Sequence, residues 1–93
     1  MRAMYQGVAI AESDQTVQVD GNHYFPPDSI DRSFLVESET TSVCPWKGTA
    51  SYYHVKVNDA VSSDAAWYYP DTKEEAKHFE GYVAFWKDVA VES

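Results

Sequence analysis

The sequence predicts a small, mainly β domain with one short helix. Hydrophobic residues make up 44% of the 93 residues and aromatic residues 15%, which gives a short chain a large apolar area for its core. Apolar and polar residues alternate in several short segments, as they do in half-buried strands, and turn-forming residues separate these segments. Because the chain is too short for two independent cores, we expect one domain over residues 1–93.

The N-terminal third predicts a strand, a hairpin and a connector. Residues 3–10 are compatible with a strand, and residues 16–25 with a hairpin that turns at residues 20–22, which tolerate positive φ. The prolines at 26–27 cannot donate hydrogen bonds to a β ladder, so they end the second strand of the hairpin. A single helical turn over residues 28–32 then forms the connector.

The central third predicts an edge strand, a loop and a longer strand. Residues 33–38 are a short apolar run typical of a strand, and residues 39–42 are polar and β-branched, which indicates an edge or a loop. An unusual loop over residues 40–48 precedes an alternating strand over residues 49–57, of which one face must be core. The turn-rich residues 58–64 follow.

The C-terminal third predicts two further strands. Residues 65–69 return antiparallel to residues 49–57, and residues 82–86 form a last buried strand before a turn and a short tail. With the earlier segments, the chain has about seven predicted strands.

A short helix is predicted between these last two strands. Thr72 and Glu75 fit a capping box, in which the two side chains satisfy each other's backbone donors. The helix runs to residue 80, and the glycine behind it suits the left-handed position past a helix end. Ala76 and Phe79, three residues apart, are expected to face the sheet.

The charge balance disfavours several classes of partner. Acidic residues number 15 and basic residues 7, and the net charge of −8 repels a phosphate backbone, so nucleic acid is not an expected partner. The same charge disfavours an anionic membrane surface, and no run approaches the ~18 apolar residues that a membrane-spanning helix needs. Residues 1–7 are not followed by the apolar stretch of a signal peptide, so we expect a cytoplasmic protein.

Cysteine, histidine and glycine positions bear on metals and cofactors. Cys44 is the only cysteine, which excludes an intrachain disulfide and a zinc site built from thiols alone. The histidines, His23, His54 and His78, lack the close pairs that pre-position metal ligands. The four glycines are isolated, so no phosphate-binding loop is expected. The sequence therefore predicts no metal and no cofactor.

The segment Cys44-Pro45-Trp46-Lys47-Gly48 concentrates residue types that are costly in an ordinary turn. In a functional interpretation, Pro45 and Gly48 hold the loop. Lys47 then activates the Cys44 thiol by its positive charge, and Trp46 forms the wall of a pocket. In the alternative interpretation, Cys44 and Trp46 fill the core and Lys47 is solvated. A thiol nucleophile also needs a base, and no histidine is adjacent in sequence, so both interpretations stay open.

Aromatic residues gather on adjacent predicted strands, where alternate residues share a face. The set comprises Tyr53, Trp67, Tyr69, Tyr82 and Trp86. Most of this set is expected to be core. Buried tyrosine hydroxyls and indole N–H groups need hydrogen-bond partners, so part of the set is expected to line a polar-tipped pocket beside Trp46 and Lys47.

Three stretches, residues 41–53, 65–70 and 81–86, together with Tyr24-Phe25-Pro26, resemble the bacterial family called domain of unknown function 427. The resemblance covers nearly the whole chain. It implies a small two-sheet β-tent, an Mss4-like architecture similar to methionine sulfoxide reductase B, in which two sheets meet at an angle. Many of these tent-like proteins hold zinc through paired Cys-x-x-Cys motifs, which this sequence lacks, so neither their metal nor their reductase activity is carried over.

The family's activity is not established, and the resemblance leaves several functions open. The positions that match its pattern and that we expect to bind a ligand are Tyr24, Cys44, Trp46, Lys47, Tyr53, Trp67 and Tyr69. Our leading prediction is a binding module, a monomer or weak homo-oligomer, whose aromatic face holds a small molecule or peptide segment with Lys47 reading its anionic group.

Three alternatives accompany this prediction. The first is a thiol-dependent enzyme with Cys44 as nucleophile. The second is nucleotidyl transfer, which a further label of the family implies, although this sequence lacks the Gly-Ser loop and Asp-x-Asp pair of such enzymes. The third is a purely structural partner protein.

Overall fold

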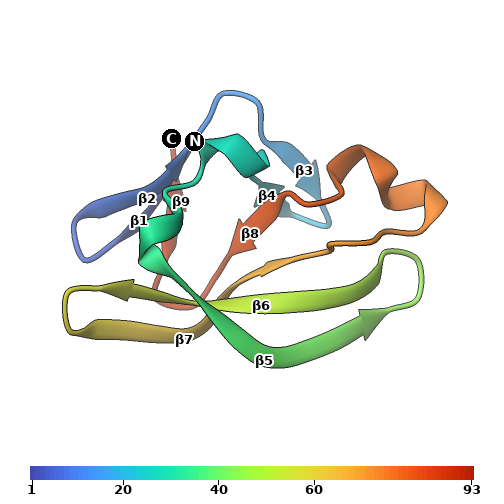
Figure 1. Ribbon diagram of the computed structural model, residues 1–93. Coiled ribbons are helices and arrows are strands. Elements are labelled where there is room, and N and C mark those ends of the chain that lie inside the picture. The colour runs from blue at the N-terminus through green and yellow to red at the C-terminus, as the bar shows by residue number, and fades with distance from the viewer.

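The computed structural model describes all residues from 1 to 93, and it confirms the mainly β class (Figure 1). The nine strands are β1 (Arg2–Tyr5), β2 (Val8–Glu12), β3 (Val17–Val19), β4 (Asn22–Tyr24), β5 (Leu35–Cys44), β6 (Gly48–Val57), β7 (Ala60–Tyr68), β8 (Val83–Phe85) and β9 (Ala90–Glu92). The three 3-10 helices are η1 (Pro27–Ser29), η2 (Arg32–Phe34) and η3 (Glu74–Phe79).

The strands form three antiparallel sheets. The largest has the order β5-β6-β7-β8, the second has the order β2-β1-β9, and β3 and β4 form a hairpin of their own. Figure 1 shows the second sheet over one side of the long β5–β7 strands, with the two chain ends close together. The strands are thus divided among three sheets rather than the two expected, and the likeness to an Mss4-type tent stays a prediction.

The β3–β4 hairpin is separate because its second strand cannot extend. Phe25 makes a single bridge with Val83 of β8, in which each backbone N–H donates to the other residue's carbonyl at 2.8 and 2.9 Å. The next two residues, Pro26 and Pro27, have no N–H to continue that pairing. A short hairpin is therefore tied to the large sheet at its base.

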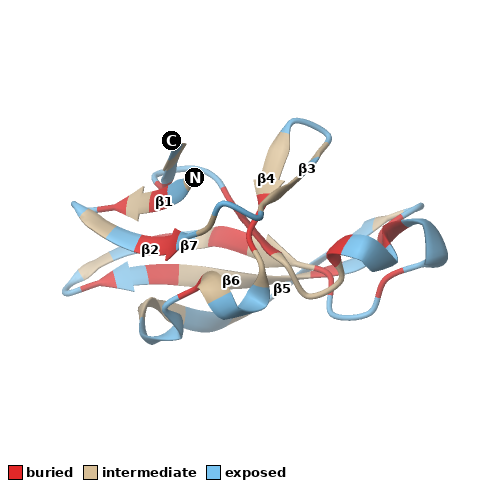
Figure 2. Ribbon diagram, turned by 90° about the horizontal axis from the view of Figure 1, so that it is seen from above, coloured by how far each residue is buried: buried red, intermediate tan, exposed pale blue.

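Two hydrophobic clusters share the large sheet as a common wall. The larger has 13 buried residues and lies between this sheet and the β2-β1-β9 sheet; buried residues of both sheets are red in Figure 2. The smaller has 6 buried residues, from β4, β6, β8, η3 and the end of β7. On β8, Val83 and Phe85 belong to the larger cluster and Ala84 to the smaller, so the two clusters lie on opposite faces.

The N-terminal part contains two hairpins, of which the sequence predicted one. The hairpin at residues 16–25 is confirmed, with Asp20 (φ 53°) and Gly21 (φ 82°) at its turn. The single strand expected over residues 3–10 is wrong, because Gln6 (φ 51°) and Gly7 (φ 75°) form a two-residue turn between β1 and β2. Positive φ at both turn residues is the geometry that short hairpins favour.

The connector also differs. The single helical turn expected over residues 28–32 is two 3-10 turns, η1 and η2, because Ile30 between them takes extended backbone and bridges Ala11 of β2.

The central strands are longer than expected. The predicted loop at residues 40–48 is reduced to the turn at residues 45–47, because β5 continues to Cys44 and pairs with β6 from Gly48 onward. β5 is an edge strand, so its polar residues face solvent without cost, and Val43 is 78% exposed. Only Asn58 and Asp59 form the next turn, since β7 already begins at Ala60.

The C-terminal part corrects two further expectations. The capping box is wrong: both the backbone N–H and the hydroxyl of Thr72 donate to the Glu80 carboxylate, at 2.9 and 3.0 Å, rather than pairing with Glu75. The helix is the 3-10 helix η3, and its residues Ala76 and Phe79 are fully buried as expected. The presumed tail contains β9, which pairs with β1, a distant partner that no local pattern reveals.

Candidate functional site

The turn after Cys44 is held against a segment from the far end of the chain. A Cβ atom on Gly48 (φ 124°) would lie 2.9 Å from the backbone oxygen of Asp71, so only glycine fits. Gly48 also forms a β-bridge with Thr72, and the backbone N–H of Lys73 donates to the carbonyl of Lys47 at 3.0 Å. These contacts fix the backbone from which Lys47 projects.

Lys47 is a buried cation with one anionic partner. The residue is 8% exposed, and its Nζ lies 2.7 Å from Oδ2 of Asp20, at the tip of the β3–β4 hairpin. The ammonium also lies 5.0 Å from the ring centre of Trp46 and 5.8 Å from that of Tyr69. Burial acts to lower the pKa of Lys47, but the hydrogen bond to Asp20 and the nearby tyrosines raise it above its usual value, so Lys47 is an ammonium.

An aromatic cavity of about 210 Å³ opens beside this ammonium. Its walls come from β4, β6, the end of β7, the turn before β6 and the residue after β8. The lining residues are Asn22, Tyr24, Lys47, Tyr52, Trp67, Tyr69 and Trp86. Apolar walls with a few placed polar groups are typical of small-molecule sites.

Two tyrosines of the cavity are held as neutral hydroxyls. Tyr24 is almost completely buried, and its hydroxyl accepts a hydrogen bond from Nε1 of Trp67 at 3.1 Å. Burial raises the pKa of Tyr24, and burial together with Tyr24 raises the pKa of Tyr69 to about 12. Both hydroxyls therefore keep their protons at neutral pH and are available as donors.

Trp86, which forms one wall of the cavity, is positioned by a hydrogen bond to Asp64. The indole N–H of Trp86 donates to the Asp64 carbonyl, and the ring packs edge-on against Trp67 with centres 5.8 Å apart. Asp64 has a left-handed backbone (φ 54°), and its carboxylate accepts from the hydroxyls of Ser38 and Thr40, which lower its pKa. The outer wall of the cavity thus depends on contacts with the edge strand β5.

The structure brings together some of the predicted site residues and separates others. Tyr24, Lys47, Trp67 and Tyr69 line the cavity. Trp46 lies beside it, 39% exposed, with its ring against Phe79. Cys44 is half-buried against the smaller cluster.

Tyr53 lies elsewhere, on the opposite face of the large sheet. Its ring stacks on Tyr68 with centres 4.8 Å apart, and its hydroxyl accepts a hydrogen bond from Arg32. The neighbouring Tyr52 faces the cavity instead, as the period of two along a strand requires.

Sequence reasoning missed four residues of the site: Asp20, Asn22, Tyr52 and Trp86. Trp86 carried a signal, since it belonged to the aromatic set. The alternation over residues 49–57 could have placed Tyr52 opposite the residues of the larger cluster. Nothing in the sequence marks Asp20 as more than a turn residue.

None of the histidines makes a hydrogen bond with Cys44. His23 bonds to the Thr16 hydroxyl, and His54 accepts from the backbone N–H of Asp64. Cys44 pairs with Gly48, which lies six residues along β6 from His54, or about 20 Å at the rise of an extended strand. The exposed ring of His78 packs against Phe79.

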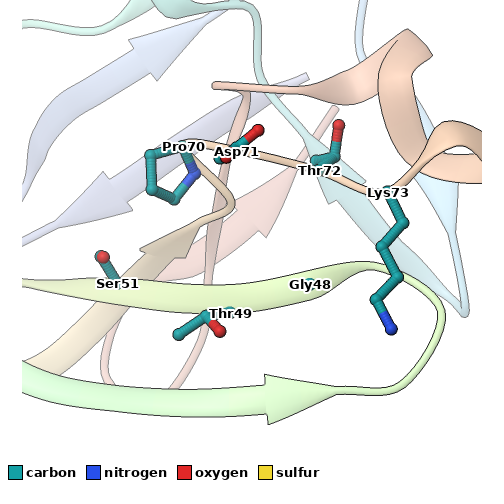
Figure 3. A pocket seen from close by; sticks show the side chains of 7 residues that line it. All are labelled: Gly48, Thr49, Ser51, Pro70, Asp71, Thr72 and Lys73. Carbon is teal, nitrogen blue, oxygen red and sulfur yellow. The ribbon is translucent and has the colours of Figure 1, made fainter.

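A second hollow, of about 380 Å³, lies behind the turn between β6 and the segment after β7 (Figure 3). Its lining residues are Gly48, Thr49, Ser51, Pro70, Asp71, Thr72 and Lys73. Lys73 points toward the turn and donates to the Pro45 carbonyl, so its ammonium supports the turn. This hollow has no aromatic wall, and the aromatic cavity is the better candidate.

No group of three or more histidine, cysteine, aspartate or glutamate side chains is arranged to hold a metal ion. No helix has the length and apolar character needed to cross a bilayer.

Comparison with known protein families gives a match over the whole chain. The sequence model of a family described as "Domain of unknown function (DUF427)" matches residues 1–93, the full length of the chain. No curated protein matches the sequence.

Proposed function

We propose that this chain, which belongs to the DUF427 family, is a binding module that holds a small molecule or a peptide segment in the aromatic cavity beside Lys47. The family description assigns no activity, so the proposal rests on the geometry of the cavity. The residues that carry it are Tyr24, Tyr52, Trp67, Tyr69 and Trp86 as walls and Lys47 as the group that reads an anion.

The observation that carries the proposal is the buried ammonium of Lys47. Burying a cation is costly unless it is paired, and a lysine used only for packing would extend its charged end into water. Lys47 instead holds its ammonium at the cavity wall, near the rings of Trp46 and Tyr69, where the partly exposed Asp20 carboxylate is its one ionic partner. A fixed cation among aromatic rings suits a ligand with an anionic group and a flat apolar part.

The electrostatics of the cavity favour binding over catalysis. A nucleophilic lysine needs a lowered pKa, and a tyrosine base needs a phenolate, but the pKa values of Lys47, Tyr24 and Tyr69 are all raised. Cys44 has no histidine to activate it. No specific observation favours the thiol enzyme or nucleotidyl transfer, so we propose no second function.

Titration followed by NMR tests the proposal. A set of single-ring aromatic acids, amides and alcohols is added to ¹⁵N-labelled protein, and the indole N–H signals of Trp67 and Trp86 report occupation of the cavity. We expect at least one compound to move both signals in a saturable way. Lys47→Gln should weaken binding of the acids about fivefold or more, the equivalent of one ion pair.

Lys56→Gln is the matched control. It removes the same charge from an exposed lysine on β6, so its affinities should equal those of the wild type. The proposal fails if no compound moves the two indole signals, or if both lysine variants weaken acid binding equally.

A further inference from the structure

The anion position of the cavity is occupied by a carboxylate of the protein itself. Oδ2 of Asp20 lies 2.7 Å from the Lys47 ammonium, the distance of a charge-assisted hydrogen bond. The two partners differ in environment, because the Lys47 side chain is 10% exposed and the Asp20 side chain 59%. A mostly solvated carboxylate therefore reaches in to a buried cation.

Two tyrosine hydroxyls near this ion pair are available as donors. The Tyr24 hydroxyl already accepts from Trp67, so its own proton is free to be donated. The Tyr69 hydroxyl stays protonated beside it. Asp20 is the only residue whose carboxylate forms an ion pair with Lys47, so one carboxylate is enough to pair this ammonium.

The element that carries Asp20 is the smallest of the three sheets. β3 and β4 pair over only three residues each, and two-stranded hairpins of this kind are marginally stable alone. The hairpin is tied to the large sheet at Phe25, whereas Asp20 lies at the opposite end, in its turn. Asp20 thus contacts Lys47 from the turn, at the end of the hairpin away from the bridge at Phe25.

Size and charge restrict the incoming ligand. A cavity of about 210 Å³ is smaller than the ~300–1,000 Å³ of sites for drug-sized molecules, so it suits one ring and a short acidic arm. A monocarboxylate would replace the charge of Asp20 one for one. A dianionic phosphate would add a charge beside a single lysine in a chain of net charge −8.

We infer, building on the proposed binding function, that Asp20 is a displaceable internal anion and that the cavity takes an aromatic monocarboxylate whose carboxylate replaces it on Lys47. The ring of the ligand then lies against Trp67 and Trp86. Asp20 thereby limits the affinity for anionic ligands, because each of them must compete with it for the ammonium.

The test compares phenylacetate with its neutral isostere phenylacetamide, in the wild type and in Asp20→Asn. The substitution removes the competing charge and suits the fold, because asparagine before glycine is a preferred pair for this left-handed turn. We expect Asp20→Asn to bind phenylacetate about fivefold more tightly or better, as expected for loss of one competing ion pair, with phenylacetamide unchanged. The indole signals of Trp67 and Trp86 report both titrations.

Asp59→Asn is the matched control, since it removes one negative charge at the tip of the β6–β7 hairpin, away from the cavity. Its affinity for phenylacetate should equal that of the wild type. Inorganic phosphate, added as a third probe, should not move the indole signals in any variant.

The outcomes separate the two levels of the proposal. If phenylacetate binds the wild type and Asp20→Asn equally, or if phenylacetamide gains as much as phenylacetate, Asp20 is not a competing anion and the inference is overturned while the cavity stands. If phosphate moves the indole signals as phenylacetate does, the monocarboxylate assignment is overturned. If no probe binds any variant, the binding function itself fails.

Discussion

Replacing Gly48 with alanine should destabilise the protein far more than the same change at Gly7, which also has a positive φ but no close neighbour. Gly48 has φ 124°, and an added Cβ would lie 2.9 Å from the backbone oxygen of Asp71 (Figure 3). Backbone atoms cannot move aside as a flexible side chain can. The new methyl group must therefore push the segment after β7 away from the turn that carries Lys47.

The magnitude follows from three contributions. Holding a non-glycine residue in this region costs roughly 1–3 kcal/mol. Overpacking against backbone adds roughly 1–3 kcal/mol. Alanine also lowers the conformational entropy of the unfolded chain, which offsets about 0.4–1 kcal/mol of the lost stability. The central expectation for Gly48→Ala is a loss of about 3 kcal/mol, which corresponds to a fall in Tm of roughly 12–24 °C in a domain of this size.

Gly7→Ala provides the internal control. Gly7 also has a positive φ, of 75°, but a Cβ there would meet no atom within 4 Å. Only the backbone strain applies, so we expect a loss of about 1 kcal/mol. Urea denaturation of both variants, followed by tryptophan fluorescence, measures the difference. Equal losses at the two glycines would show that the approach of Asp71 does not constrain the turn, which would refute the reasoning.

Two further predictions concern single hydrogen bonds. Tyr24→Phe leaves the Trp67 indole N–H without its acceptor, so the free energy of unfolding should fall by about 1–2 kcal/mol and the Trp67 NMR signal should shift; Tyr52→Phe, at a partly exposed site, should cost less than ~0.5 kcal/mol. An unmoved Trp67 signal would contradict this. Hydrogen bonds, the largest effect coming from the Thr72 backbone N–H, lower the pKa of Glu80 to about 2. The stabilising contribution of Glu80 is therefore complete above its ordinary pKa of 4.5 and is lost as the pH falls toward 2. Glu80→Gln should therefore be less stable than the wild type at pH 7, with the gap in urea titrations narrowing as the pH falls from 4.5 toward 2; a constant gap would argue against the linkage.

The fold could be predicted where burial alone decides the structure. The alternation over residues 49–57 gave the correct faces, because Val55 and Val57 must reach the larger cluster. Prediction of the fold failed where contacts with residues distant in the sequence determine the structure. The residues before Ala65 have the composition of a turn, yet Ser62 lies within β7 and its hydroxyl donates to Asp88 at 2.9 Å. The pairing of β9 with β1 is likewise invisible to local patterns.

The candidate site could be predicted in part for a similar reason. The family resemblance indicated Tyr24, Lys47, Trp67 and Tyr69, which the structure places around one cavity. It could not separate Tyr53 from its neighbour Tyr52, because a shift of one residue along a strand reverses the face. Asp20 could not be predicted, because its ion pair with Lys47 depends on where the tip of the hairpin lies in the folded protein.

The unequal clusters on the two faces of the large sheet have a consequence for how the cavity would be filled. The larger cluster has 13 buried residues and is covered by a second sheet. The smaller cluster has 6 and adjoins the aromatic cavity. An aromatic ligand would lie against the tyrosines of that smaller cluster and against Trp67, which packs on it, and would enlarge the apolar area that the cluster buries. The bound ligand would then pack like an additional core residue. Binding of the ligand would therefore also stabilise the fold on this face of the sheet.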